Sequence, residues 1–176
     1  MPPGDSLPQP PRAIFFDFGD TLCDEATEVK DVTLTTLRAE LIPGAAALLR
    51  ELKERGIPLA LVADGRPGTY RNVLGRHGLY DLFDAFAISE ELGCEKPDPR
   101  LFEHALQQLG IGPEEYGRVL MVGNNLARDV KGANRLGLVS VWLDWAPRRA
   151  KVPADAWEKP RYTIKEPLQL LELLNR

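Results

Sequence analysis

Five short apolar runs, separated by helical patterns, constrain the fold of this chain more than any other feature. The clearest run covers 13–16 and stops at Asp17, and the run over 58–63 stops in the same way at Asp64. The other three runs lie at 85–88, 119–122 and 138–143. Continuous apolar runs of this length are typical of strands that are buried on both faces of a parallel sheet.

Helical patterns fill the intervals between these runs. Residues 44–55 place apolar side chains on one face and stop at Gly56, which suits the position after a helix end. Residues 99–109 follow Asp98, a favourable N-cap, and begin with proline. Shorter helices are expected near 67–77, 126–136 and 167–175, and a last strand near 161–164. This alternation predicts a three-layer α/β fold with a Rossmann-like parallel sheet covered on both faces.

The size and charge of the chain narrow its class. At 176 residues we expect one core domain, 13–176, preceded by a disordered proline-rich tail, 1–12. The net charge of −4 argues against a nucleic-acid partner, and no apolar run approaches the roughly 20 residues of a membrane span. The first residues lack the basic and apolar parts of a secretory signal, and Cys23 and Cys94 match no metal-ligand spacing. These features predict a soluble cytoplasmic protein with reduced thiols and without nucleic-acid or membrane partners.

One segment combines aromatic and basic residues, namely Trp142, Trp145, Arg148 and Arg149. Such a combination can contact nucleic acid, but in an acidic chain we interpret Trp142 as an ordinary core residue. The two arginines are interpreted as part of a solvated linker.

Three polar residues mark where a ligand is expected to bind. Asp17, Asp64 and Asn124 each stand just past the carboxyl end of a predicted strand. In parallel α/β sheets, ligands bind beyond these ends, at the point where the strand order reverses. The sequence therefore predicts a site at the carboxyl edge of the sheet.

Four segments in chain order resemble the motifs of the haloacid-dehalogenase superfamily. Residues 17–22 (DFGDTL) are similar to its first motif, Asp-x-Asp-x-Thr, and 59–65 stand where the family has a strand ending in Ser or Thr. Residues 96–99 match its Lys-Pro-Asp-Pro signature, and 123–129 (GNNLARD) match its final Gly-Asp…Asp motif. The resemblance covers about residues 13–145, and four pieces in order are far more specific than any one of them. It implies a parallel sheet with the strand order 5-4-1-2-3.

The resemblance also implies a site for phosphoryl transfer. A carboxylate at a strand end can attack phosphorus and form an aspartyl-phosphate, which divides one hard step into two. Asp17 is the expected nucleophile, and Lys96 is the fixed positive charge beside it. Oxygen ligands suit Mg²⁺, the implied cofactor. The implied metal ligands are Asp17, the Gly19 carbonyl, Asn124 and Asp129, and the implied phosphate contacts are Ala63, Asp64 and Gly65.

Some of these residues have a structural alternative. Asp129 can pair with Lys96 instead of binding metal, and Asp64 can fix a turn with Gly65 instead of lying against phosphate. Gly65 and Gly123 are interpreted as glycines that let backbone amides approach a phosphate closely.

Three positions depart from the pattern of the family's phosphatases. Gly19 stands where they have the Asp that protonates the leaving group, and Asp20 beside it is expected to point elsewhere. Ala63 replaces a hydroxyl residue, and Asn124 replaces a carboxylate. The preferred function is Mg²⁺-dependent hydrolysis of a phosphomonoester through an aspartyl-phosphate on Asp17. Two alternatives stay open: a catalytically degenerate binding domain and, less favoured because the family's dehalogenases carry Tyr where Gly19 stands, a 2-haloacid dehalogenase.

The interval 23–42 bears on the size of the substrate. Members of the family that act on small metabolites commonly insert a large helical cap there, whereas this interval has room for one helix and its approach. Ordinary core elements also fill 63–96. An open site excludes water poorly by itself. It suits a bulky or macromolecular phosphorylated substrate, or a homo-oligomer in which a second subunit serves as the lid.

Overall fold

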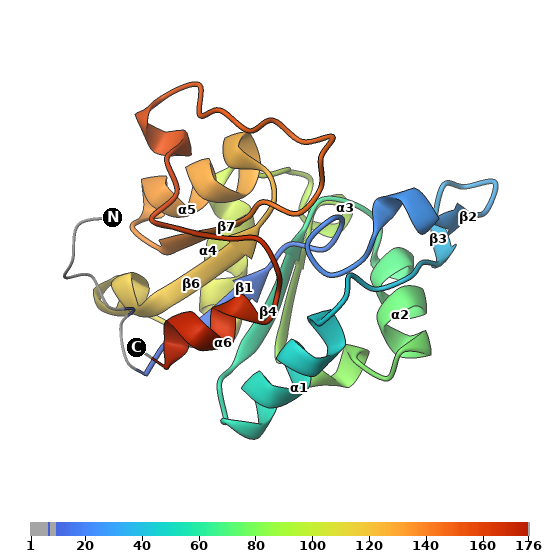
Figure 1. The fold of residues 1–176 in the computed structure, drawn as a ribbon, viewed down its shortest axis with the longest axis horizontal. Coiled ribbons are helices and arrows are strands. Elements are labelled where there is room, and N and C mark those ends of the chain that lie inside the picture. The colour runs from blue at the N-terminus through green and yellow to red at the C-terminus, as the bar shows by residue number, and fades with distance from the viewer. Residues whose placement is uncertain (1–6, 8–9, 176) are drawn as a thin grey trace.

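A six-stranded parallel sheet forms the centre of the computed structural model, which describes Leu7 and residues 10–175 (Figure 1). The strands are β1 Ala13–Phe16, β4 Leu59–Ala63, β5 Ala85–Ile88, β6 Val119–Gly123, β7 Val139–Leu143 and β8 Tyr162–Ile164. Their order in the sheet is β5-β4-β1-β6-β7-β8. Counted along the chain, the first five of these strands reproduce the predicted order 5-4-1-2-3, and β8 adds a sixth strand beside β7. The predicted fold class is confirmed.

The sheet is covered on both faces because its strands are apolar throughout. In β1, Ile14 and Phe16 point into one core, and Ala13 and Phe15 point into the other, since successive side chains in a strand alternate. The first core is closed by α1 Ala45–Glu54, α2 Pro67–Arg76 and α6 Gln169–Leu174. The second core is closed by α4 Pro99–Gln108 and α5 Lys131–Leu136 (Figure 1).

The helices begin and end close to the predicted positions. Asp98 caps α4, because its carboxylate accepts a hydrogen bond from the backbone N–H of Arg100. The predicted helix over 126–136 is present, but it begins as a π-helical turn, Leu126–Val130, and continues as α5. Such turns often occur at functional sites. The remaining short elements are α3 Ser89–Leu92 and the 3-10 turns Glu25–Thr27, Tyr80–Leu82, Pro113–Arg118 and Ala156–Glu158.

The interval 23–42 does not form the helix for which it has room. The interval contains the 3-10 turn Glu25–Thr27 and a small antiparallel hairpin, β2 Val29–Lys30 and β3 Thr36–Arg38. The carboxylate of Asp31 accepts hydrogen bonds from the backbone N–H groups of Thr33 and Thr35 and so holds the chain in a turn. Side chains of this type compete with helix formation.

The hairpin rests on helix α2. The backbone N–H of Thr36 donates to the hydroxyl of Thr69 at 3.0 Å, and the side-chain amide of Asn72 donates to the Thr36 carbonyl at 3.0 Å. The β2–β3 hairpin therefore lies beside the carboxyl edge of the sheet (Figure 1). The described residues of this interval contain no helical cap.

The predicted tail, 1–12, falls largely on residues 1–6 and 8–9, which lie outside the described residues. Within it, Leu7 is described and is buried in the first core. The division into a tail and one core domain stays a prediction.

Several further features bear on the expectations from composition. None of the helices in the described ranges is long and apolar enough to cross a membrane. Cys23 and Cys94 are buried free thiols. Trp142 is a core residue, as predicted, and its indole N–H donates to the Asn124 carbonyl at 3.0 Å.

Candidate active site

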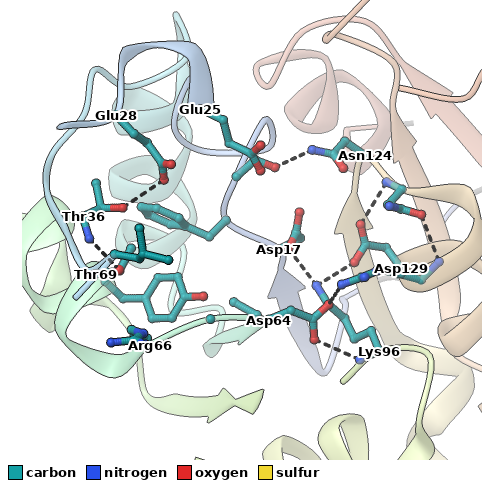
Figure 2. Close-up of a pocket in the computed structure, with 18 of the residues that line it drawn as sticks. Asp17, Glu25, Glu28, Thr36, Asp64, Arg66, Thr69, Lys96, Asn124 and Asp129 are labelled. Atoms are coloured by element: carbon teal, nitrogen blue, oxygen red, sulfur yellow. Dashed lines mark hydrogen bonds and ion pairs between the residues drawn. The ribbon is translucent and has the colours of Figure 1, made fainter. Parts of the chain in front are cut away.

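The carboxyl ends of β4, β1 and β6 meet at one cleft. In the central strand β1, Phe16 is in register with Leu61 on one side and Val122 on the other, so the residues that follow emerge together. The cleft has a volume of about 430 Å³ (Figure 2). Every predicted site residue lines it: Asp17, Gly19, Ala63, Asp64, Gly65, Lys96, Asn124 and Asp129.

Lys96 joins the two carboxylates at the base of the cleft. Its Nζ lies 2.7 Å from Oδ1 of Asp17 and 2.7 Å from Oδ1 of Asp129, and it donates to the Val62 carbonyl at 2.8 Å. The hydroxyl of Thr21 donates to Oδ2 of Asp17 at 3.1 Å. Apart from the ion pair with Lys96, Oδ1 of Asp129 is without a hydrogen-bond donor. Asp17 thus faces the lysine, with one donor on each of its carboxylate oxygens.

This cluster has one cation, Lys96, and two carboxylates, Asp17 and Asp129, all with little exposure to solvent. Burial by itself lowers the pKa of Lys96, but Asp129, Asp17 and Asp64 hold that pKa above its usual value. Burial raises the pKa of Asp129 to about 7, and the nearby Asp17 carboxylate adds to this effect while Lys96 opposes it. Lys96 therefore stays protonated, and its single positive charge does not neutralise both carboxylates beside it.

Asn124 and Gly19 supply neutral oxygen atoms beside Asp17. The side-chain amide nitrogen of Asn124 donates to the Gly19 carbonyl oxygen, and a rotation of that amide exchanges its nitrogen for its oxygen. The second oxygen of Asp129 accepts from the backbone N–H of Asn125 at 3.0 Å. Within the part of the chain that is described, no three His, Cys, Asp or Glu side chains cluster as metal ligands. The Asp17 carboxylate, the Gly19 carbonyl and the Asn124 side-chain amide nevertheless offer the oxygen ligands that Mg²⁺ prefers.

The end of β4 positions Lys96 from the other side. Asp64 accepts from the backbone N–H of Lys96 at 2.9 Å through one oxygen and from the Arg128 guanidinium at 3.0 Å through the other. The N–H of Gly65 donates to the Ser89 hydroxyl at 2.8 Å. Asp64 therefore links the end of β4 to Lys96 and to Arg128 on the π-helical turn.

Side chains of the site fill the space beside two glycines. A Cβ atom added at Gly123 would lie 2.3 Å from the carboxyl carbon of Asp129, and one at Gly65 would lie 2.4 Å from the Tyr70 hydroxyl. At such distances a side chain at either position would displace Asp129 or Tyr70 from its observed place, so glycine is favoured at both positions. This packing is the reason for the two glycines that the structure shows, and a phosphate contact at Gly65 stays a prediction.

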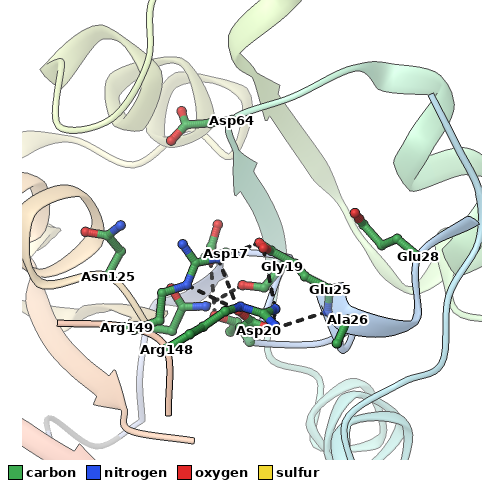
Figure 3. A network of polar contacts seen from close by, with 12 residues as sticks. Asp17, Gly19, Asp20, Glu25, Ala26, Glu28, Asp64, Asn125, Arg148 and Arg149 are labelled. Carbon is green, nitrogen blue, oxygen red and sulfur yellow. Dashed lines mark hydrogen bonds and ion pairs between the residues drawn. The ribbon is translucent and has the colours of Figure 1, made fainter. Parts of the chain in front are cut away.

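A second charged cluster lies on loops at the same edge (Figure 3). Asp20 is fully buried and accepts from Arg148 at 2.5 Å and from Arg149 at 3.2 Å. Arg149 also donates to Oε1 of Glu25 at 2.7 Å. Asp20 points to these arginines, so Arg148 and Arg149 pair with a buried carboxylate although their side chains are 44% and 28% exposed. Sequence spacing does not reveal a pair that spans 128 positions.

Sequence patterns missed several charged residues that line the cleft, among them Glu25, Glu28 and Arg128. Burial raises the pKa of Glu25; the charge of Arg149 opposes this, and the Asp20 and Asp17 carboxylates reinforce it. The signal for Glu25 was the acidic run Asp24, Glu25 and Glu28 just after the first motif. It stands at no strand end, so the topological rule did not select it.

A parallel α/β sheet with Asp17 and Lys96 paired at its carboxyl edge is the arrangement that the resemblance to the haloacid-dehalogenase superfamily implies. The chain belongs to the haloacid dehalogenase-like hydrolase family, whose pattern matches residues 27–137, more than half of its length. This confirms the resemblance drawn from the four motifs.

Individual relatives include enzymes of two kinds. The chain is 45% identical over 107 residues to a phosphoserine phosphatase of Thermus thermophilus, which covers 61% of this chain and 42% of the relative. It is 32% identical over 125 residues to an (S)-2-haloacid dehalogenase of a Pseudomonas species, which covers 71% of this chain and 51% of the relative. The chain spans about half the length of the curated relatives it matches.

A solved structure extends the likeness over nearly the whole chain. A HAD phosphatase from Thermococcus onnurineus superposes with a TM-score of 0.75 and 19% sequence identity, covering 93% of this chain and 97% of that one. At this identity the likeness concerns the fold.

Proposed function

We propose that this chain hydrolyses phosphomonoesters through an aspartyl-phosphate on Asp17. The observation that carries the proposal is the Asp17 carboxylate itself, held by Lys96 at 2.7 Å and by Thr21 at 3.1 Å at the base of an open cleft. A nucleophile fixed in this way is already oriented for attack. Similarity to a phosphoserine phosphatase over 107 residues supports the same reaction class.

In the proposed mechanism an oxygen of Asp17 attacks phosphorus and the alcohol departs. Water then attacks the phosphorus of the aspartyl-phosphate, which releases inorganic phosphate and restores the carboxylate. Lys96 offsets the negative charge that gathers as the phosphate dianion approaches Asp17 and Asp129. Such fixed charges commonly supply the largest part of the rate enhancement.

Asp17, the Gly19 carbonyl and Asn124 are proposed to hold Mg²⁺, with Asp129 behind them as a further ligand or as the partner of Lys96. The chemistry that Mg²⁺ supplies when bound is charge compensation for the phosphoryl oxygens. Because Asn124 is neutral where the family's phosphatases have a carboxylate, the site carries one negative charge less, and we expect weaker Mg²⁺ binding.

The test compares the wild-type chain with Asp17→Asn on an activated aryl phosphate in the presence of Mg²⁺. We expect the substitution to lower turnover by more than about 10³-fold, because it removes the nucleophile. Asp81→Asn, at an exposed position outside the cleft, is the matched control and should keep the wild-type rate. Equal rates for the wild type and Asp17→Asn would overturn the covalent mechanism.

Two other outcomes correspond to the alternatives. Phosphate binding without Mg²⁺-dependent turnover would indicate a degenerate binding domain. Release of chloride from a 2-haloacid without metal would indicate a dehalogenase, the activity named for one relative.

The substrate is proposed to be bulky, such as a phosphoprotein, with closure by a second subunit as the other possibility. One side of the cleft is lined by the short β2–β3 hairpin in place of a large helical cap, and this supports an open site. A higher kcat/KM for a phosphopeptide than for free phosphoserine supports the bulky substrate. Activity that rises more steeply than the protein concentration, together with dimers in sedimentation, supports the second subunit.

A further inference from the structure

The carboxyl group of Glu25 occupies the space in front of Gly19. A Cβ atom added at Gly19 would lie 2.0 Å from Oε1 of Glu25, 2.7 Å from its carboxyl carbon and 2.8 Å from its Cγ. Two groups cannot share this space, so a side chain at position 19 and the observed Glu25 side chain exclude one another. The carboxyl group in front of Gly19 is thus that of Glu25, and not that of a residue at position 19.

The position of Glu25 is fixed by its neighbours. Its Oε1 accepts from Arg149 at 2.7 Å, and its backbone N–H donates to the buried Asp20 carboxylate at 3.2 Å. Asp20 in turn holds both Arg148 and Arg149. Asp20 and the two arginines therefore place the Glu25 carboxyl group beside Gly19 (Figure 3).

Glu25 also has access to the reacting groups and to water. It lines the same cleft as Asp17 and Lys96, and Figure 2 shows the Glu25 and Asp17 carboxyl groups turned toward one hollow. Its side chain is 36% exposed, so it can exchange protons with solvent. Asp20, by contrast, is fully buried among the arginines and does not line the cleft.

We propose that Glu25 is the general acid and base of the hydrolysis, in place of a carboxylate at position 19; this inference rests on the proposed function. In the first step Asp17 forms a bond to phosphorus, the ester P–O bond breaks, and the departing alkoxide takes the proton of the Glu25 carboxyl group. In the second step the Glu25 carboxylate takes a proton from the attacking water, whose oxygen bonds to phosphorus as the bond to Asp17 breaks. Glu25 ends protonated and Asp17 ends ionised, as both began.

Glu28 is the other carboxylate on this side of the cleft, and its contacts differ. Its Oε1 accepts from the Thr36 hydroxyl at 3.2 Å, and its Oε2 pairs with Lys30 at 2.9 Å. Both oxygens of Glu28 are held toward the β2–β3 hairpin, away from Gly19. Glu28→Gln is therefore the matched control for Glu25→Gln.

The experiment measures the two steps separately in Glu25→Gln, Glu28→Gln and the wild type. With an alkyl phosphate, Glu25→Gln should lose about 10²–10⁴-fold in turnover, because a poor leaving group needs the proton. With dinitrophenyl phosphate, the initial burst of one phenolate per site should remain, while the steady-state rate falls because water is no longer activated. Glu28→Gln should keep the wild-type dependence of turnover on the leaving group.

Relocating the carboxyl group gives a second, independent measurement. Glu25→Ala frees the space in front of position 19, and Gly19→Asp combined with it returns a carboxyl group there. We expect this double variant to turn over the alkyl phosphate at least tenfold faster than Glu25→Ala alone. No recovery, in a double variant with the wild-type unfolding midpoint, would count against the inference.

The outcomes separate this inference from the function on which it rests. If the wild type turns over and Asp17→Asn does not, but Glu25→Gln keeps the wild-type dependence on leaving group, only the role of Glu25 is overturned. If no Asp17-dependent turnover exists, both proposals fail.

Discussion

The two charged clusters at the carboxyl edge differ in how their charges are balanced. Lys96 is a single ammonium buried between the carboxylates of Asp17 and Asp129. Asp17 directly follows β1, Asp129 lies in the π-helical turn after β6, and Lys96 lies in the loop before α4. The loop cluster has two acids and two arginines, and the arginine side chains are 28% and 44% exposed. Solvent screens the arginines of the loop cluster, whereas the side chains of Lys96 and Asp129 are only 1% exposed. Burial therefore decides how strongly a change in either cluster is felt.

Removing Lys96 is expected to have the largest effect. Lys96→Met leaves the buried Asp129 and the partly buried Asp17 without their cation. We expect a loss of about 3–5 kcal/mol in the free energy of unfolding, together with loss of turnover. Urea denaturation followed by circular dichroism measures the first, and aryl phosphate hydrolysis measures the second.

A second substitution tests the cause of that loss. Lys96→Met combined with Asp129→Asn removes one of the two uncompensated charges, so part of the lost stability should return while turnover stays absent. If the double variant is no more stable than Lys96→Met, charge imbalance is not the cause.

The loop cluster should respond less. Asp20→Asn removes a fully buried charge, but its arginine partners reach solvent, so we expect a loss of about 1–3 kcal/mol in the free energy of unfolding. The measurement is the urea midpoint at constant denaturant slope. An unchanged midpoint would show that the arginines find equivalent partners in water.

The same contrast explains what the sequence could and could not predict. Asp17, Asp64 and Asn124 were identified because each follows an apolar strand, and the parallel topology brings such ends together. Lys96 was identified by its Pro-Asp-Pro context.

The loop cluster carries no such signal. Glu25 lies in a 3-10 turn, and its partner Arg149 lies 124 residues further on, so only the folded chain brings them together. The hairpin in 23–42 was missed because hydrogen bonds from backbone N–H groups to the Asp31 carboxylate, rather than apolar periodicity, determine its shape. Sheet topology predicts that residues at neighbouring strand ends lie close together, but it does not predict ion pairs between loops that are far apart in the sequence.

A third prediction adds charge to the strand-end cluster. Asn124→Asp restores a carboxylate beside Asp17, and we expect Mg²⁺ to bind about tenfold more tightly, equivalent to roughly 1.4 kcal/mol. Isothermal titration with MgCl₂ measures the change. Unaltered affinity would indicate that Asn124 is not a ligand.

The smallest effect is expected for an exposed pair of similar length. Arg55 and Glu51 on α1 lie 2.8 Å apart, close to the 2.7 Å of Lys96 and Asp17, but their side chains are 32% and 42% exposed. Glu51→Gln should change the free energy of unfolding by about 0.5 kcal/mol or less. A loss as large as that of Asp20→Asn would show that exposure does not govern the difference.

The bond between Asp20 and Arg148 also has a consequence for the order of folding. It closes a loop of 128 positions, so it forms only after both ends of the chain have docked on the central strands. Contacts of such long range are slow to form because the entropy of the intervening chain is lost first. During refolding from urea, secondary structure should therefore return before the Glu25 carboxyl group reaches its place, and catalytic competence should be the last property the chain regains.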